Sequence, residues 1–345
     1  MLKFDLTNSK LLDRLRSEDE MDLSLYTSFM TICKKSEDFL NRFASNFPTY
    51  TDHSIEHSFN IIKYIEIILD EVNINQLNSD ERYILLSSAI LHDSGMCIPP
   101  DKIEEELGSN NYKRLKNEYS DGNNEIDFIR KIHHELSYYF IINNYLELGI
   151  INPEYAKVIA LISKAHRKVK IDDFNTFELR KTLRTGTEFV CMPYLACILR
   201  LADELDITNV RTPEIIIKYY EPDDEKGKKE FAKHKATRIV NRQGKIINII
   251  AKTDSPQVYN ALVLMIEKIK KTLQYCQKII HTISGTGRKH YSLQASMIDE
   301  NIKTIGFEPK KIKFAFNIDF IFNWFVSKNL YKERTFAIRR SCKMP

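Results

Sequence analysis

Apolar residues recur at helical spacing through most of the first 205 residues, and this periodicity restricts the fold more than any other feature of the sequence. The clearest stripe follows His53 and consists of Ile55, Phe59, Ile62, Ile65, Ile68 and Leu69. Glycine and proline number only 10 each among 345 residues, so few positions favour a tight turn or interrupt a helix. The sequence therefore predicts a mainly α-helical protein.

A helical bundle is predicted for residues 1–215. Its helices are expected over residues 23–47, 53–72, 81–95, 125–148, 153–166 and 193–206, whereas the Asn-rich stretch 108–124 predicts a loop. After Asn209 the pattern changes to two β-rich runs within 236–252, a helix over 260–283, and strands at 290–298 and 310–317. We therefore expect a small α+β domain over 222–317, followed by a helix and basic tail at 318–345.

The composition excludes several classes of protein. The 51 basic and 47 acidic side chains leave a net charge of +4, which is too small for a strongly basic nucleic-acid coat. The six cysteines are scattered without a CxxC pair, so neither a disulfide framework nor a zinc knuckle is expected. No apolar run approaches the roughly 18–20 residues that span a bilayer. We expect a soluble cytoplasmic protein that does not enter a membrane.

Histidine is unevenly distributed along the chain, with six of the nine histidines between His53 and His166. The side chains suited to binding a metal are His57, His92, Asp93, His133, His166 and Asp203. When His92–Asp93 is counted as one position, successive candidate ligands lie 33 to 41 residues apart in the sequence. This spacing is about the length of one or two helices with a connecting segment. Ligands from successive helices can therefore converge at one point of a bundle. Imidazole and carboxylate together suit Mn, Fe, Zn, Co or Ni.

The apolar surroundings of the two acids strengthen this hypothesis. His92–Asp93 ends the run ILLSSAIL, and Asp203 lies within LACILRLADELD. Burying such groups is costly unless they are well bonded or coordinate something. Without a cysteine in the set, a closed structural zinc site is not expected.

Five motifs, HSIEHS, LLSSAILHDSG, RKIHHELS, IALISKAH and LRLADELD, resemble in order those of the HD-domain metal-dependent phosphohydrolase superfamily, over about residues 25–210. The H…HD…D core of that superfamily matches His57, His92, Asp93 and Asp203. Two further histidines follow the HD pair in its HD-GYP branch, and His133 and His166 match them by order. The resemblance implies an HD-fold bundle that holds two divalent ions, with Asp93 bridging them.

The resemblance also implies an activity. Bound Mn, Fe, Zn, Co, Ni or Mg would activate a water to attack phosphorus in a phosphate ester, either a nucleotide or a related phosphorylated small molecule. Two alternatives are kept. One is a phosphodiesterase that acts on cyclic nucleotides or single-stranded nucleic acid, and the other is a nucleotide-sensing regulatory module coupled to an ATPase.

Some features depart from the HD-GYP pattern. Met96 stands where that branch has a lysine, and the GYP signature is absent, so hydrolysis of cyclic di-GMP is not expected. The chain more closely resembles HD hydrolases of bacterial conflict and stress systems, in which the HD domain precedes an ATPase of the gyrase, chaperone and histidine-kinase type. Residues 320–339 look like the approach to that ATPase, and the match stops after Arg339, as a truncated or split gene would produce.

Further side chains are candidates for contact with the substrate. Lys164, Arg167, Lys168 and Arg211 could bind a phosphate, although a position on a solvated helix face or loop explains each of them at least as well, and explains the two lysines better. His53 shares a helix face with His57 and is a candidate ligand, acid–base group or capping residue. The predicted catalytic residues are thus Asp93, His53 and Arg167.

Other polar residues are expected to support the site or to lie outside it. Arg130 and Arg200 each precede a predicted ligand by three residues and could orient carboxylates, and Asp206 could support the ligands in the same way. Of the neighbours His133 and His134, only His133 is expected to ligate, because adjacent helix positions diverge. His234 and His281 lie among lysines and are predicted to be on exposed faces.

Overall fold

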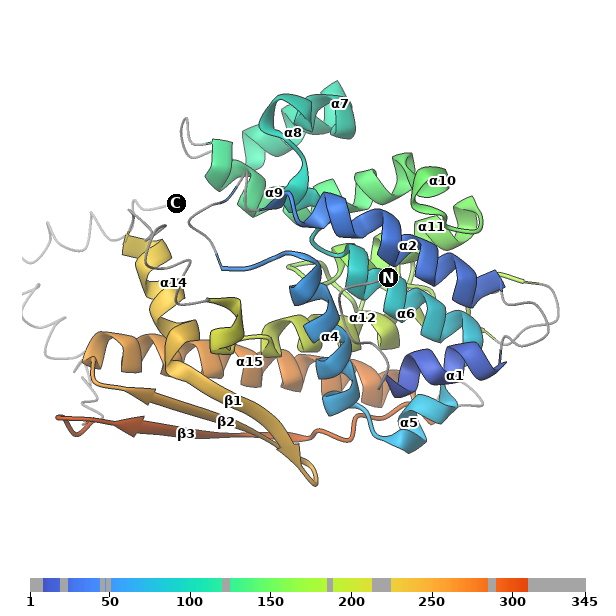
Figure 1. Ribbon diagram of the computed structural model, residues 1–345. Helices are drawn as coiled ribbons and strands as arrows, with labels where there is room; N and C mark the ends of the chain where they lie inside the picture. Colours follow the sequence, from blue (N-terminus) through green and yellow to red (C-terminus); the bar gives the residue numbers. More distant parts are fainter. Residues whose placement is uncertain are drawn as a thin grey trace, which may run out of the picture. The chain divides into compact units, whose positions relative to one another are not determined.

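Helices account for most of the chain in the computed structural model (Figure 1). The structure describes residues 9–18, 24–43, 47, 51–119, 125–184, 189–212, 225–284 and 290–309. The chain divides into two compact units, 1–306 and 307–345, and the described helices and strands lie in the first. The fold is mainly α with a small α+β part after the bundle, which confirms the predicted fold class.

The helical part runs from α1 to α12. It begins with α1 (Lys10–Glu18), α2 (Ser24–Leu40), α4 (Ile55–Ile68), α5 (Glu71–Gln76) and α6 (Ser79–Leu91). The 3₁₀ turns η1 (Ser94–Cys97) and η2 (Pro100–Lys102) lead to α7 (Ile103–Leu107), α8 (Ser109–Tyr119), α9 (Glu125–Asn143), α10 (Tyr145–Leu148), α11 (Pro153–Lys164) and α12 (Met192–Leu205). Local sequence fixes several starts: the Asn78 and Asn152 side chains accept backbone N–H groups at the first turns of α6 and α11.

Helix α6 is the central helix of the bundle. Every residue from Asp80 to Leu91 is buried, and α2, α4, α11 and α12 all pack against this helix. A helix that is buried on every side lies in the interior of the bundle. The residues that follow α6 are therefore delivered into the core.

The α+β part contains a three-stranded sheet. This part of the chain follows the 3₁₀ turn η3 (Asn209–Arg211). Its elements are α14 (Glu225–Ala236), β1 (Thr237–Gln243), β2 (Ile246–Thr253), α15 (Pro256–Ile283) and β3 (Met297–Thr304). Strands β1 and β2 form an antiparallel hairpin whose turn uses Gly244 at φ 58°, a left-handed backbone conformation that glycine adopts without steric cost. Strand β3 pairs parallel to β2, and α15 connects them and packs against α12 (Figure 1).

Two local predictions were wrong. The stretch 108–124, predicted as a loop, contains α8, because Leu115 is buried and Tyr112 packs edge-on against Phe128 of α9. This apolar face outweighs the low helix propensity of the asparagines. The strand predicted at 290–298 begins at Met297 instead, since only from there does the chain pair with β2.

Several other predictions fall on residues outside the described ranges. These are the domain boundary between 215 and 222, the strand at 310–317, and the helix and tail at 318–345. They stay predictions. Among the described helices, none is long and apolar enough to cross a bilayer.

Candidate metal centre

The six side chains predicted as ligands come from five helical segments and form one cluster. His57 is on α4, His92 and Asp93 follow α6, His133 is on α9, His166 follows α11, and Asp203 is on α12. Five of them are buried, and 17% of the Asp203 side chain is exposed. The cluster consists of two triplets, His57–His92–Asp203 and Asp93–His133–His166, and within each the ligand atoms lie within 4.8 Å of one another.

Gly95 allows the turn after α6 to lie against α9. A Cβ atom at this position would overlap the carbonyl oxygen of His133 and would lie 2.6 Å from the backbone nitrogen of Ser137. The Gly95 N–H instead donates to the Ser137 hydroxyl at 2.9 Å. The glycine of the HDSG sequence thus keeps Asp93 and His133 close together.

The first triplet gathers around the Nε2 atoms of His57 and His92, which lie 3.2 Å apart. The Asp203 Oδ1 atom is 3.5 Å from the former and 3.8 Å from the latter. Asp93 adds its Oδ2 atom, 3.4 Å from His57 Nε2 and 3.2 Å from His92 Nε2. Two imidazoles and two carboxylates therefore face one point.

The second triplet uses the other oxygen of Asp93. Its Oδ1 atom lies 3.4 Å from Nε2 of His133 and 3.4 Å from Nε2 of His166. The two Nε2 atoms are 2.9 Å apart. The two oxygens of the Asp93 carboxylate thus face the two groups of ligands, and the bridging of two ions by Asp93 stays a prediction.

The hydrogen bonds of the Nδ1 atoms show that His92, His133 and His166 point the lone pairs of their Nε2 atoms into the cluster. The Nδ1 atoms of His92, His133 and His166 bond to the carbonyl oxygens of Ala89, Arg130 and Ser163, at 2.9, 2.8 and 2.6 Å. A carbonyl only accepts, so each Nδ1 carries the proton, and each Nε2 of the neutral ring is a bare acceptor. Acceptors that converge at such distances repel one another unless a cation lies between them. The donor set therefore fits a divalent metal.

Charge in the cluster follows from burial and close contacts. Burial and Arg211 both oppose a proton on His57, yet its bonds to three carboxylates raise its pKa to about 10; these are Asp203, Asp206 and Asp93. Burial alone would raise the pKa of Asp93, but the neighbouring imidazoles hold it well below its usual value. Burial lowers the pKa of His166 to about 3. The cluster thus attracts positive charge while its second triplet keeps neutral imidazoles.

The HD-CE family model matches residues 47–281, more than half of the chain. The chain belongs to the HD-CE family. The match covers the whole ligand cluster and extends through α14 and most of α15. A search of curated proteins gives no significant match.

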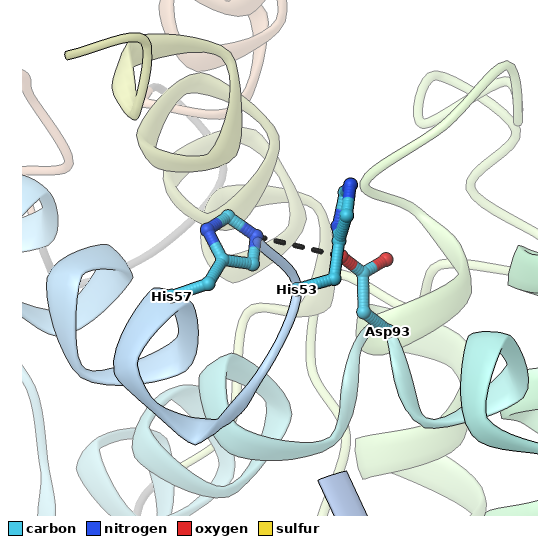
Figure 2. A group of neighbouring side chains, drawn as sticks. All are labelled: His53, His57 and Asp93. Atoms are coloured by element: carbon cyan, nitrogen blue, oxygen red, sulfur yellow. Dashed lines mark hydrogen bonds and ion pairs between the residues drawn. The ribbon is translucent and has the colours of Figure 1, made fainter. Parts of the chain in front are cut away.

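In this HD-CE chain, His53 contacts Asp93 directly. Its Nδ1 atom lies 2.6 Å from Asp93 Oδ2, and His53 and His57 both lie beside that carboxylate (Figure 2). The Arg211 guanidinium is 2.9 Å from His53 Nε2 and also donates to the carbonyl oxygens of Asp52 and Asp206. Burial, with Arg211, lowers the pKa of His53 to about 4. Ligation and acid–base roles both fit this position, since His53, His57 and Asp93 form a third potential metal-binding triplet.

A cavity of about 370 Å³ opens onto the cluster. Among the predicted phosphate-binding cations, Arg167 and Arg211 line it. Arg167 has no carboxylate partner among the described residues, whereas the Arg211 donors are largely used within the protein. Lys164 and Lys168 are not among the lining residues: Lys164 bonds to Glu135 at 2.9 Å, and Lys168 is exposed. Arg167 is therefore the better placed of these cations to contact a phosphate.

The supporting residues lie partly where the sequence suggests. Asp206 is buried and accepts from His57 Nδ1 at 2.6 Å, so it orients that ring. The prediction for Arg200 was wrong, because it donates to the carbonyl oxygens of Ala165 and Val169, at 2.7 and 2.6 Å, and not to a carboxylate. Arg130 pairs with Asp127 at 3.2 Å at the edge of the cavity.

Sequence reasoning missed the far wall of the cavity. Phe231, Lys233 and His234 of α14, and Met265 and Lys268 of α15, all line it. The prediction that His234 is exposed was wrong, since only 6% of its surface is accessible. The charged sequence of α14 carries no signal for this role, because the role depends on how α14 packs against η3 and α15. His281 is exposed, as predicted.

Proposed function

We propose that this HD-CE chain is a divalent-metal-dependent phosphohydrolase that cleaves a phosphate ester, a nucleotide or a related compound. The observation that carries the proposal is the position of Asp93, whose two carboxylate oxygens face two separate groups of imidazole nitrogens. His57, His92, Asp203 and Asp93 would hold one ion, and Asp93, His133 and His166 a second. Such ions, when bound, polarise a phosphoryl group and lower the pKa of water.

The protein's own residues support the same chemistry. Arg167 follows His166 and lines the cavity, so its guanidinium can bind a phosphate oxygen beside the second triplet. His53 lies 2.6 Å from Asp93 and borders the cavity with 20% of its side chain exposed. It is thus placed to exchange a proton with the substrate or to orient Asp93. The buried cluster excludes bulk water, which strengthens these interactions.

The test is a substrate panel with added Mn²⁺. Protein purified without chelator would be analysed for bound metals, then assayed on p-nitrophenyl phosphate, bis-p-nitrophenyl phosphate, nucleoside phosphates, cyclic nucleotides and single-stranded oligonucleotides. We expect hydrolysis of phosphate esters by the wild type and its loss in Asp93→Ala. Asp101→Ala, at an exposed position of η2, serves as the control.

The same panel separates the alternatives. Turnover confined to cyclic nucleotides or oligonucleotides would favour the phosphodiesterase. Nucleotide binding without turnover in metal-loaded protein would favour a regulatory module coupled to an ATPase, of the kind found in bacterial conflict systems. Absence of bound metal, together with activity that survives Asp93→Ala, would refute the metal site itself.

A further inference from the structure

The turn after α11, residues 165–172, carries Arg167 at the edge of the cavity. The Arg167 N–H donates to the carbonyl oxygen of Lys164 at 3.4 Å, and the Arg167 carbonyl accepts from the Val169 N–H at 2.8 Å. Both partners are near neighbours in the sequence, so these bonds shape the turn without fixing it to the rest of the protein. The position of the Arg167 guanidinium therefore depends on the contacts that other segments make with the turn.

Tyr275 of α15 makes two of those contacts. Its hydroxyl accepts the backbone N–H of Ile171 at 3.0 Å and donates to the Asp172 carboxylate at 2.8 Å. A phenolic hydroxyl both donates and accepts, so the two bonds form together. Ile171 is fully buried, so its N–H depends on the tyrosine oxygen for a partner. Tyr275 thus anchors the end of the turn to the α+β part of the chain.

The ring of Tyr275 also supports the start of the turn. The Arg200 guanidinium lies over this ring, 5.7 Å from its centroid. The same guanidinium donates to the carbonyl oxygens of Ala165 and Val169, at 2.7 and 2.6 Å. A cation over the face of an aromatic ring is attracted to it, so Tyr275 helps to hold Arg200 in place. The tyrosine and the arginine together bond the turn on both sides of Arg167.

We infer that Tyr275 is a positioning residue, which holds Arg167 where its guanidinium contacts the phosphate of the substrate. The inference rests on the proposed function, because it assumes that the phosphate lies at the ligand cluster beside Arg167. Tyr275 is not among the residues that line the cavity, so its effect on the substrate passes through the turn. Through this residue the α+β part of the chain sets the geometry of the phosphate site.

Tyr275→Phe removes the hydroxyl and keeps the ring beneath Arg200. In Mn²⁺-loaded protein, we expect this change to raise the calorimetric Kd of inorganic phosphate about fivefold, the effect of a lost hydrogen bond. The KM for p-nitrophenyl phosphate should rise by a similar factor while kcat changes less than about twofold, because Arg167 binds the phosphate in the ground state and the transition state alike. Asp172→Ala, at an exposed position, removes only one of the two bonds and should raise the Kd less.

Arg167→Ala distinguishes positioning from a general role in stability. In that background, Tyr275→Phe should leave the phosphate Kd unchanged, since the group that Tyr275 positions is gone. A tyrosine that only stabilised the fold would have the same effect with and without Arg167. Tyr139→Phe is the matched control: Tyr139 of α9 packs edge-on against Tyr138, and its hydroxyl bonds to no other described residue. It should change neither constant.

Three results would overturn the inference. They are an unchanged phosphate Kd and KM in folded Tyr275→Phe, an equal loss of phosphate affinity with and without Arg167, and a wild type that neither binds phosphate nor hydrolyses an ester. Calorimetry decides even when nothing is hydrolysed. Phosphate binding that depends on Tyr275 through Arg167, without turnover of any ester, would remove the proposed hydrolase and leave the positioning role intact.

Discussion

Asp206 is the residue that orients His57 from outside the ligand set. It is fully buried and accepts from His57 Nδ1 at 2.6 Å, which turns the Nε2 atom toward Asp93 and Asp203. A carboxylate in this position also makes the imidazole a stronger ligand. His57 would therefore lose both orientation and basicity if the charge of Asp206 were removed.

We expect Asp206→Asn to lower the affinity for Mn²⁺ roughly 10–100-fold, because an amide accepts a weaker bond than a carboxylate. Calorimetric titration of the chelator-treated protein measures this directly. Asp101→Asn, an exposed aspartate, should leave the affinity unchanged. Equal affinities in wild type and Asp206→Asn would show that the His57 contact has no role in binding metal.

At the residue scale, the sequence predicted the polar cluster better than the cavity around it. His57, His92 and Asp93 stand out because each lies in an apolar helical stretch, where burial of an ionisable group is costly unless it is well bonded or coordinates a metal. His234 lies among lysines, so only the packing of α14 shows that it is buried. Lys164 looked available for phosphate, but its partner Glu135 comes from α9 and is not visible in the local sequence.

At the element scale, Arg200 ties α12 to the turn after α11. Its guanidinium bonds to carbonyl oxygens on both sides of His166, at Ala165 and Val169. We expect Arg200→Met to lower the free energy of unfolding by about 2–3 kcal/mol, since hydrogen bonds to a charged group are lost and buried carbonyls stay unpaired. Metal affinity should fall as well, because His166 loses its support.

Urea unfolding and Mn²⁺ titration measure these two effects. Arg238→Met, at an exposed position on β1, is the matched control and should change neither. If Arg200→Met lost stability but kept full metal affinity, the turn would hold His166 in place without the arginine.

At Gly95 the backbone of η1 lies directly against the backbone of α9. We expect Gly95→Ala to destabilise the chain by about 1–3 kcal/mol, because a methyl group there overlaps backbone atoms that cannot rotate away. The shift should also reduce metal binding, since His133 supplies one of the overlapped atoms. Ser137→Ala, which removes only the hydroxyl that accepts the Gly95 N–H, should lose stability but keep metal affinity. Equal metal affinities in the two variants would contradict this.

Element prediction failed where tertiary contacts outweighed local composition. Helix α8 is rich in asparagine and charge, yet Tyr112 and Leu115 give it an apolar face that α9 covers. Strand β3 is shifted toward the C-terminus because its register is set by pairing with β2. The sequence alone does not show which residues of β2 and β3 pair with each other.

At the scale of the whole molecule, the cluster joins segments that are far apart in the chain. The ligands span α4 to α12, and the cavity above them is closed by α14 and α15, so the HD-CE match over 47–281 corresponds to one site. An ion bound there would interact with the folded chain alone, because unfolding separates its ligands.

Bound metal should therefore stabilise the entire fold. At a free concentration one hundred times its Kd, one ion adds about 2.7 kcal/mol to the free energy of unfolding. Urea or thermal unfolding of chelator-treated protein, with and without Mn²⁺, Co²⁺ or Zn²⁺, measures this increment. Asp93→Asn should lose most of it, since both triplets share that carboxylate, whereas Asp101→Asn should keep it. A wild-type unfolding midpoint that none of these ions moves would mean that the bare nitrogens of the cluster face each other without a cation, and the proposed hydrolase would lose its basis.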